Sequence, residues 1–339
     1  MHRNQILRRF VQVLIFLTIL YLAEWLLSLL LCREPSSWGR KILNQIYQED
    51  SIDVCFVGGS QVLQGIDPEI AQKKLGGTVV NITSSQQPPA ATAALVREIL
   101  DEHPEISEVY VSLDYSLLMT EDVNLESIYI VADAMKPSWN KIRYLLKATP
   151  QEYYLNSFLP LRKGEGYASS LSEIMENLKT LFSENYRKRF AAGGFANNAG
   201  MSEAEFAALA AEVSGKDEIQ PLADETGTVV LPERSVQALR DILAACEKSG
   251  VQPVFVATPI PEFMTEKIAD YDEYVQAVEE ILSAAGAAYY DYNTAMSAAD
   301  EESVSQFDRN AAENFTDEYH LSGTGAGQFT SLLLTETMR

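Results

Sequence analysis

The chain has 339 residues, and 47% of them are hydrophobic, which predicts a folded globular body rather than wholesale disorder. The net charge is −22; without residues 1–33, which hold four arginines and one glutamate, the remainder has 22 basic and 47 acidic residues, a charge of −25. Such an acidic surface repels phosphate backbones and argues against nucleic acid as a partner. Three cysteines are too few for a disulfide framework.

The first predicted element is an apolar helix that crosses a membrane. Phe10–Leu31 is a 22-residue run with few polar members, and a helix of about 20 residues spans a bilayer core. The run is too long for the apolar part of a secretory signal and lacks an Ala-x-Ala-like cleavage site, so we expect an uncleaved single-pass anchor. Glu24 lies close enough to the far interface to reach headgroups. Residues 1–33 are thus expected to form a cytoplasmic tip and an anchor in the cell membrane. The Arg8-Arg9 pair favours the N-terminus inside and the globular body outside the cytoplasm.

A linker and then an alternation of strands and helices follow. Residues 34–50 are predicted to be a juxtamembrane linker with a short helix over Lys41–Tyr47, and the globular domain covers 51–339. Five short apolar runs predict buried parallel strands at Val54–Val57, Val79–Ile82, Val109–Leu113, Val254–Ala257 and Ala288–Tyr290. Helical patterns occupy Pro68–Leu75, Ala90–Glu102, Glu233–Ser249 and Tyr271–Ala285. This alternation predicts a doubly wound α/β sheet with helices on both faces.

The alternation is interrupted once, after the third predicted strand. Helical patterns lie near Trp139–Ala148, Ser170–Phe190 and Ser202–Val213, whereas Ala191–Gly200 and Gly215–Gly227 have the composition of loops. We therefore expect a mainly helical insertion at about 120–228. Because it begins on the carboxyl-end rim of the sheet, where ligands of such sheets bind, it is expected either to select the substrate or to dock a partner membrane protein.

The end of the first predicted strand carries a possible nucleophile. Val57 is followed by Gly58-Gly59-Ser60. Glycines permit a sharp turn, and a helix that starts there lends its N-terminal amides and dipole to a developing oxyanion. The same segment also fits a bare turn in which Ser60 caps the helix.

The histidines narrow the choice of a general base. His2 precedes the membrane run, His103 lies in a surface-like segment, and His320 follows the last predicted strand. Asp317 stands three residues before His320, so its carboxylate can hold the imidazole in one tautomer while the other ring nitrogen faces a serine. A capping aspartate beside a surface histidine would look the same, but the position after the last strand favours a site made of Ser60, His320 and Asp317.

These two segments resemble the SGNH/GDSL hydrolase family. Gly58-Gly59-Ser60 is similar to its first sequence block, and Asp317-x-x-His320 is similar to its last. The stretches Gly58–Pro68 and His320–Phe329 resemble a membrane-anchored branch with the D-alanyl-lipoteichoic acid transfer protein and polysaccharide O-acetyl esterases and transferases. The resemblance covers the sheet but not the insertion, and it implies a three-layer α/β/α fold with a five-stranded flavodoxin-like sheet.

The resemblance also implies an oxyanion hole. Its donors would be the backbone amides of Ser60 and of a second-block residue that falls on Gln86, where the family has a glycine. The third block of the family carries an asparagine, whereas this chain has Asp114. An ionised carboxylate would repel an oxyanion, so Asp114 is expected either to point elsewhere or to stay protonated.

The predicted function is an extracytoplasmic serine esterase or acyltransferase that acts on ester-linked acyl groups of a cell-envelope polymer, either a polysaccharide or a teichoic acid. A membrane acyltransferase is a possible partner, and the insertion is expected to select the acyl acceptor. The alternative, supported by Asp114, is a non-catalytic membrane-anchored scaffold or polymer-binding protein with a degenerate SGNH fold. The sequence contains no dinucleotide-binding glycine motif, no Walker loop and no His/Cys cluster with metal spacing, so no cofactor or metal ion is expected.

Overall fold

A computed structural model of the chain describes residues 2–31, 39, 42–159, 161, 168–182, 194–294, 297 and 306–338. Two predicted features lie partly outside the described residues. They are the juxtamembrane linker, at 34–38, 40 and 41, and the end of the helix expected near Ser170–Phe190, at 183–190.

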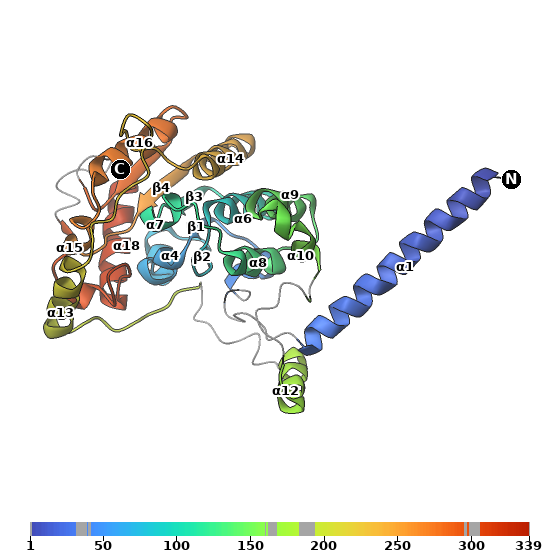
Figure 1. Cartoon of the computed structure of the whole chain (residues 1–339). Helices are drawn as coiled ribbons and strands as arrows, with labels where there is room; N and C mark the ends of the chain where they lie inside the picture. Colours follow the sequence, from blue (N-terminus) through green and yellow to red (C-terminus); the bar gives the residue numbers. More distant parts are fainter. Residues whose placement is uncertain are drawn as a thin grey trace.

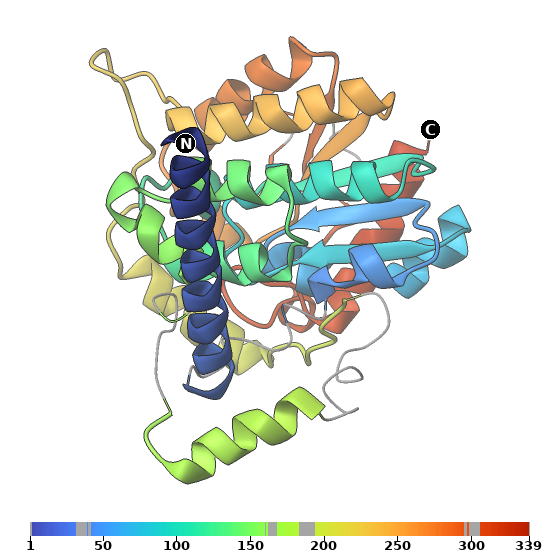
Figure 2. The ribbon, with the colours of Figure 1, turned by 90° about the vertical axis from the view of Figure 1, so that its right-hand side faces the viewer.

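The N-terminal helix α1 (His2–Leu31) extends away from the body. Its segment Gln5–Ser28 is long and apolar enough to cross a membrane, as an anchor or as a signal sequence. Near its C-terminal end α1 contacts helix α12 (Leu171–Phe182), and Figures 1 and 2 show the two side by side there. The Leu161 amide donates to Glu24 Oε1 at 3.2 Å, so the insertion supplies a partner for the one acidic residue of the helix.

Five parallel strands form one sheet. They are β1 (Val54–Gly58), β2 (Val79–Thr83), β3 (Glu108–Ser112), β4 (Pro253–Ala257) and β5 (Ala288–Asp291). Each predicted strand is confirmed to within one residue at either end. The spatial order is β2-β1-β3-β4-β5, which is the flavodoxin-like order, and every neighbouring pair is parallel. The order reverses between β1 and β3, so the carboxyl ends of these strands flank the point where ligands bind in such sheets.

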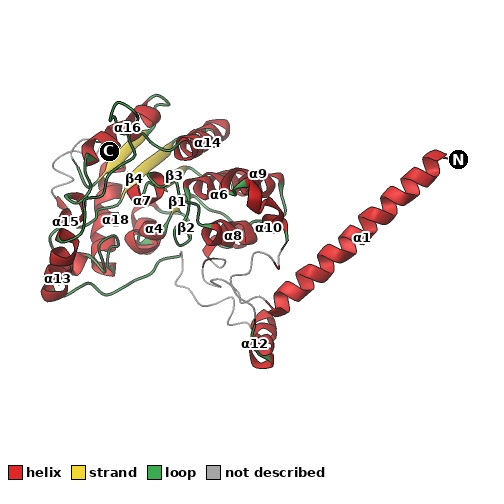
Figure 3. Ribbon diagram, in the orientation of Figure 1, coloured by secondary structure: helices red, strands yellow, loops and turns green. Residues whose placement is uncertain are grey.

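Helices cover both faces of the sheet, as predicted (Figure 3). The two-residue period of β1 explains why: Cys55 and Val57 pack into one hydrophobic cluster, and Val54 and Phe56 into another on the opposite face. The first cluster is completed by α3 (Gln45–Gln48), α6 (Pro89–Glu102), α14 (Glu233–Ser249) and α16 (Tyr271–Ser283). The second is completed by α4 (Ser60–Gly65), α5 (Pro68–Leu75) and α18 (Gly323–Thr337).

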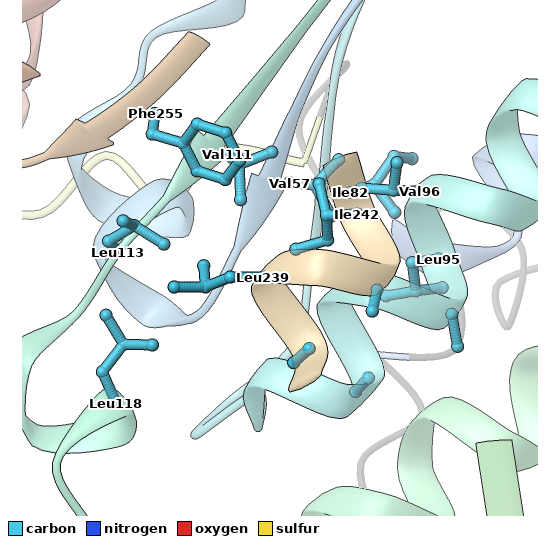
Figure 4. Packing of buried hydrophobic residues seen from close by; sticks show 14 of the residues in the cluster. Val57, Ile82, Leu95, Val96, Val111, Leu113, Leu118, Leu239, Ile242 and Phe255 are labelled. Atoms are coloured by element: carbon cyan, nitrogen blue, oxygen red, sulfur yellow. The ribbon is translucent and has the colours of Figure 1, made fainter. Parts of the chain in front are cut away.

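Figure 4 shows the first cluster from close by, with strand side chains such as Val57, Val111 and Phe255 pointing toward Leu239 and Ile242 of α14. All five side chains are at most 1% exposed. Burying one aliphatic or aromatic side chain of this size contributes about 1.5–3 kcal/mol. This packing fixes the strands whose ends carry the polar residues described below.

Two helices of ten or more residues were not predicted from periodicity, and each has a physical reason. Seven of the ten residues of α8 (Leu125–Ala134) are buried, so the helix lacks the exposed polar face that produces a 3.6-residue pattern. Helix α18 begins with Gly323-Thr324-Gly325, and glycine has a low helix propensity. A Cβ on Gly325 would lie 2.2 Å from the Asn314 carbonyl oxygen, so close packing requires a glycine there.

The insertion at about 120–228 packs in two separate places. Its first part lies beside α6 and contains α8, α9 (Trp139–Ala148), the 3-10 helix η1 (Gln151–Tyr153) and α10 (Tyr154–Phe158). Its last part, α13 (Glu203–Ser214), packs against α15 (Glu262–Thr265) and the 3-10 helix η3 (Ala312–Asn314). Figure 1 shows these two parts on opposite sides of the body. The insertion therefore reaches the rim of the sheet from both sides.

Candidate active site

The turn after β1 places Ser60 at the start of α4, on the carboxyl-end rim of the sheet. The expected sharp turn is present, since β1 ends at Gly58 and α4 begins at Ser60, but neither glycine has a positive φ. Close packing requires them instead. A Cβ on Gly58 would lie 2.6 Å from Ser112 Cβ and 2.7 Å from Val62 Cγ2, so the strand and the helix approach too closely for any side chain there.

The segment before α18 forms a tight loop that positions the imidazole. An antiparallel bridge joins Phe315 to Leu321, and the Thr316 amide donates to the His320 carbonyl at 2.9 Å. Inside this loop Asp317 Oδ1 accepts the amide of His320 at 3.0 Å, as well as that of the preceding residue at 2.8 Å. The aspartate therefore stabilises the turn and holds its carboxylate beside the ring of His320.

The three predicted catalytic side chains lie in one hydrogen-bonded row. Ser60 Oγ is 2.7 Å from His320 Nε2, and His320 Nδ1 is 2.8 Å from Asp317 Oδ2. When Nδ1 carries the proton and donates to the carboxylate, Nε2 is free to accept the serine hydroxyl proton. Burial raises the pKa of Asp317, but the hydrogen bond and charge of His320 and the loop amides lower it by a larger amount. The pKa of Asp317 therefore lies below its ordinary value. The carboxylate is therefore ionised near neutral pH.

The predicted oxyanion-hole residues lie on the same rim. Gly58 of β1 pairs with Thr83 of β2, so Ser60 and Gln86 follow the ends of adjacent parallel strands. The first amides of a helix have no intrahelical acceptor, which leaves the Ser60 amide available. Gln86 has a φ of +46°, a left-handed conformation that glycine adopts easily and other residues seldom adopt. The backbone at Gln86 thus has the conformation expected of a glycine, while the part that its amide plays stays a prediction.

Asp114 caps a short helix that begins directly after it, and both alternatives expected for its carboxylate stay predictions. Its Oδ1 accepts the Ser116 amide at 2.9 Å and the Ser116 hydroxyl at 2.7 Å, at the start of α7 (Tyr115–Leu118). Burial raises the pKa of Asp114, and these bonds lower it in part. The carboxylate therefore caps α7, and its net pKa lies above the ordinary value because burial outweighs these bonds.

A segment that the sequence indicated only as a loop ties the two halves of the site together. Residues 194–201, here called the strap, contact both the helix that follows Ser60 and the loop that carries His320. The Asn198 side chain donates to Gln64 Oε1 at 2.8 Å, and its backbone carbonyl accepts the Gly323 amide at 2.8 Å. The strap is rich in Ala, Gly and Asn, a composition typical of a flexible connection, so no sequence signal indicated that it joins the two halves of the site.

Two cavities flank α7. The first, here called the Tyr319 cavity, has a volume of about 250 Å³, and its lining includes Gln61, Asp114 and Tyr319. The second, here called the Gln86 cavity, has a volume of about 590 Å³ and is lined by Gln86 and largely by insertion residues from 120 to 148. Thr120 lines both cavities.

His103 is not at the surface, contrary to the expectation. It is 4% exposed, and its Nε2 lies 2.7 Å from the Ile46 carbonyl oxygen. Its Nδ1 lies 3.0 Å from Glu105 Oε1, so both ring nitrogens have partners, and the contact with Ile46 joins the end of α6 to α3. Within the described part of the chain, no group of three or more His, Cys, Asp or Glu side chains is arranged to hold a metal ion.

Comparisons with known proteins give little further information. No family model and no curated protein matches the chain. Among solved structures, a protein from Streptococcus pneumonia, provisionally described as a platelet activating factor, is 12% identical over 95% of this chain and 99% of its own, with a TM-score of 0.36. The type III effector protein XopQ, solved with adenosine diphosphate ribose, is 11% identical over 74% of this chain and 76% of its own, with a TM-score of 0.13. Likenesses this weak say nothing about function.

Proposed function

We propose that this chain is a serine esterase or acyltransferase of the SGNH kind. The observation that carries the proposal is the row of hydrogen bonds from Ser60 Oγ through His320 to Asp317, at 2.7 and 2.8 Å. A serine, an imidazole and a carboxylate in this order form the arrangement that activates a hydroxyl nucleophile on several unrelated folds. The row lies at the end of β1, beside the switch point of the sheet, where such folds bind ligands.

In the proposed reaction, Ser60 Oγ attacks the acyl carbon of an ester while His320 Nε2 takes the hydroxyl proton. The oxyanion is stabilised by the Ser60 amide and, as predicted, by the amide of Gln86. Asp317 holds the proton on His320 Nδ1 and stabilises the imidazolium. When the C–O bond breaks, His320 returns the proton to the departing alkoxide, which leaves an acyl group on Ser60. An incoming hydroxyl then loses its proton to His320 and attacks the acyl carbon; the bond from this carbon to Ser60 Oγ breaks, and His320 returns the proton to Ser60 Oγ.

The acceptor decides between hydrolysis, with water, and transfer, with a sugar or polyol hydroxyl. We place the acceptor in the Gln86 cavity, because insertion residues supply most of its wall. The family resemblance covers the sheet but not the insertion, and in such folds the segments outside the common scaffold determine the substrate. We further propose that α1 anchors the body to the outer side of the cell membrane, so the substrate is an acyl ester of an envelope polymer. A membrane acyltransferase would be a natural partner as donor of the acyl group.

The proposal is tested by labelling the full-length protein in detergent with a fluorophosphonate probe, which reacts with activated serines. Wild type is expected to label, and Ser60→Ala and His320→Ala are each expected to abolish labelling. Ser249→Ala is the matched control, because Ser249 is exposed at the far end of α14. Labelling that persisted in Ser60→Ala would place the nucleophile elsewhere. An unlabelled but folded wild type would favour the non-catalytic scaffold.

A further inference from the structure

The Tyr319 cavity has a wall made mainly of carbon. Its apolar lining comes from β-strand ends, α15 and the last part of the insertion, and includes Leu113, Met119, Ile219, Ala257, Ile260 and Met264. Its lining also includes Gln61 and Tyr319, which are the chain neighbours of Ser60 and His320. An acyl group attached to Ser60 Oγ therefore lies next to an apolar space.

Several polar groups of this wall have hydrogen-bond partners within the protein, whereas the buried hydroxyl of Tyr115 has none among the described residues. Asn293 Oδ1 accepts the Ile260 amide at 2.8 Å, and Asn293 Nδ2 donates to the Thr258 carbonyl at 3.0 Å. The Tyr271 hydroxyl donates to the buried Asp291 at 2.9 Å. A ligand with hydroxyl groups would lose its hydrogen bonds to water on entering and gain few in return, which is unfavourable.

The roof of the cavity is fixed by backbone pairing. Ile219 forms a parallel bridge with Ile268. The Ile219 amide donates to the Lys267 carbonyl at 2.9 Å, and the Ala269 amide donates to the Ile219 carbonyl at 2.9 Å. The mainly polar stretch 215–227 thus contributes an isoleucine to the cavity wall. The two hydrogen bonds of this bridge hold that part of the wall in place.

We propose that the Tyr319 cavity binds the acyl chain of the donor ester and that the enzyme prefers acyl chains of about six to ten carbons over acetyl. This inference rests on the proposed function of Ser60. An apolar cavity of about 150 Å³ in another protein holds one benzene, which has six carbons, so 250 Å³ corresponds to about ten. Acetyl would leave most of the space empty. Each additional buried methylene is expected to improve kcat/KM about fourfold until the pocket is full.

The test is the turnover of p-nitrophenyl esters from acetate to laurate by the full-length protein in detergent. We expect kcat/KM to rise at least 30-fold from the acetyl ester to an optimum between hexanoyl and decanoyl, and to fall for lauroyl. Ile219→Trp fills the cavity from its roof and is expected to lower the octanoyl-to-acetyl ratio at least tenfold. Val230→Trp is the matched control: Val230 follows the same polar stretch, is 37% exposed and is not part of the cavity lining, so the ratio should stay near that of wild type.

Several outcomes would overturn the inference. An optimum at acetyl, with longer esters turned over progressively more slowly, would show that the chain does not enter the cavity. An octanoyl-to-acetyl ratio that is the same in wild type and in a cooperatively melting Ile219→Trp variant would also contradict it. If Ser60 is labelled by fluorophosphonate but the chain-length preference is absent, only this inference fails. If no ester is turned over and Ser60 is not labelled, the proposed function fails with it.

Discussion

Replacing Gly58 with alanine is expected to slow the reaction of Ser60 far more than it lowers stability. The new Cβ would lie 2.6 Å from Ser112 Cβ, whereas ordinary contacts begin at 3.4 Å, so β1, α4 and β3 must separate by about 0.8 Å in total. Overpacking of this kind costs about 1–3 kcal/mol, which lowers the melting temperature of a domain this large by about 2–6 °C. Ser60 lies only two residues further on, and a misplacement approaching 1 Å at a reacting atom costs on the order of 10–100-fold in rate.

Two measurements test this reasoning, namely the melting temperature and the second-order rate of fluorophosphonate labelling. Gly215→Ala is the matched control, because Gly215 has a φ of −78° and a Cβ there would come no closer than 3.4 Å to any atom of another residue apart from its chain neighbours. Its melting temperature should match that of wild type or rise slightly. A Gly58→Ala protein with the labelling rate of wild type would refute the reasoning. It would mean that the Ser60 turn tolerates a side chain where the structure leaves no space.

Three further predictions concern orientation, pH and the strap. Protease added to right-side-out membrane vesicles should digest the body, and complete protection would reverse the proposed orientation of α1. Burial raises the pKa of Asp317, but His320 and the loop amides lower it by a larger amount, so the pKa in the folded protein is below the unfolded value of about 4. The ionised carboxylate therefore contributes stability above the unfolded pKa, and this stability is lost as the pH falls through the lower folded pKa. Melts of wild type and Asp317→Asn between pH 6 and pH 3 should therefore show a smaller loss of stability in the variant, and parallel curves would contradict this. Asn198→Ala removes the bond to Gln64 and should slow labelling several-fold while costing only about 0.5 kcal/mol of stability; an unchanged rate would mean that the strap does not position the site.

The sheet was predictable because its strands are short, continuous apolar runs separated by helical patterns. Strands that are buried on both faces, such as Val54–Gly58, have apolar side chains on both faces, so each one is visible in the sequence as a continuous apolar run. The positions of Ser60 and His320 followed from the topology, since residues after the carboxyl ends of parallel strands meet on one rim. What periodicity missed was α8, whose nearly complete burial removes the polar face that the pattern depends on.

The strap and the roof of the Tyr319 cavity were not predictable for a different reason. Apart from the bond between the Asn198 and Gln64 side chains, the hydrogen bonds described for them are made by backbone amides and carbonyls, as in the Ala196 amide that donates to the Leu63 carbonyl at 2.8 Å. Any residue type except proline offers the same donor, so such pairing leaves no mark on the sequence. Ile219 is one of a few apolar residues in a mainly polar stretch, and only the tertiary structure shows that it lines a pocket. The close approach that requires Gly58 is likewise a property of three packed elements.

The separation of Ser60 and His320 along the chain has a consequence for folding. The two are 260 positions apart and are joined through contacts of α18 with α4 and α5, while Phe56 and Phe329 share one cluster. Contacts between such distant segments form late in folding, because the entropy cost of closing a long loop precedes the stabilisation that the contacts provide. A chain that stops before the final loop therefore keeps its serine but has no base to activate it. Chemistry at Ser60 thus begins only when the last helix has been made and has docked, so labelling of this serine also reports completed folding.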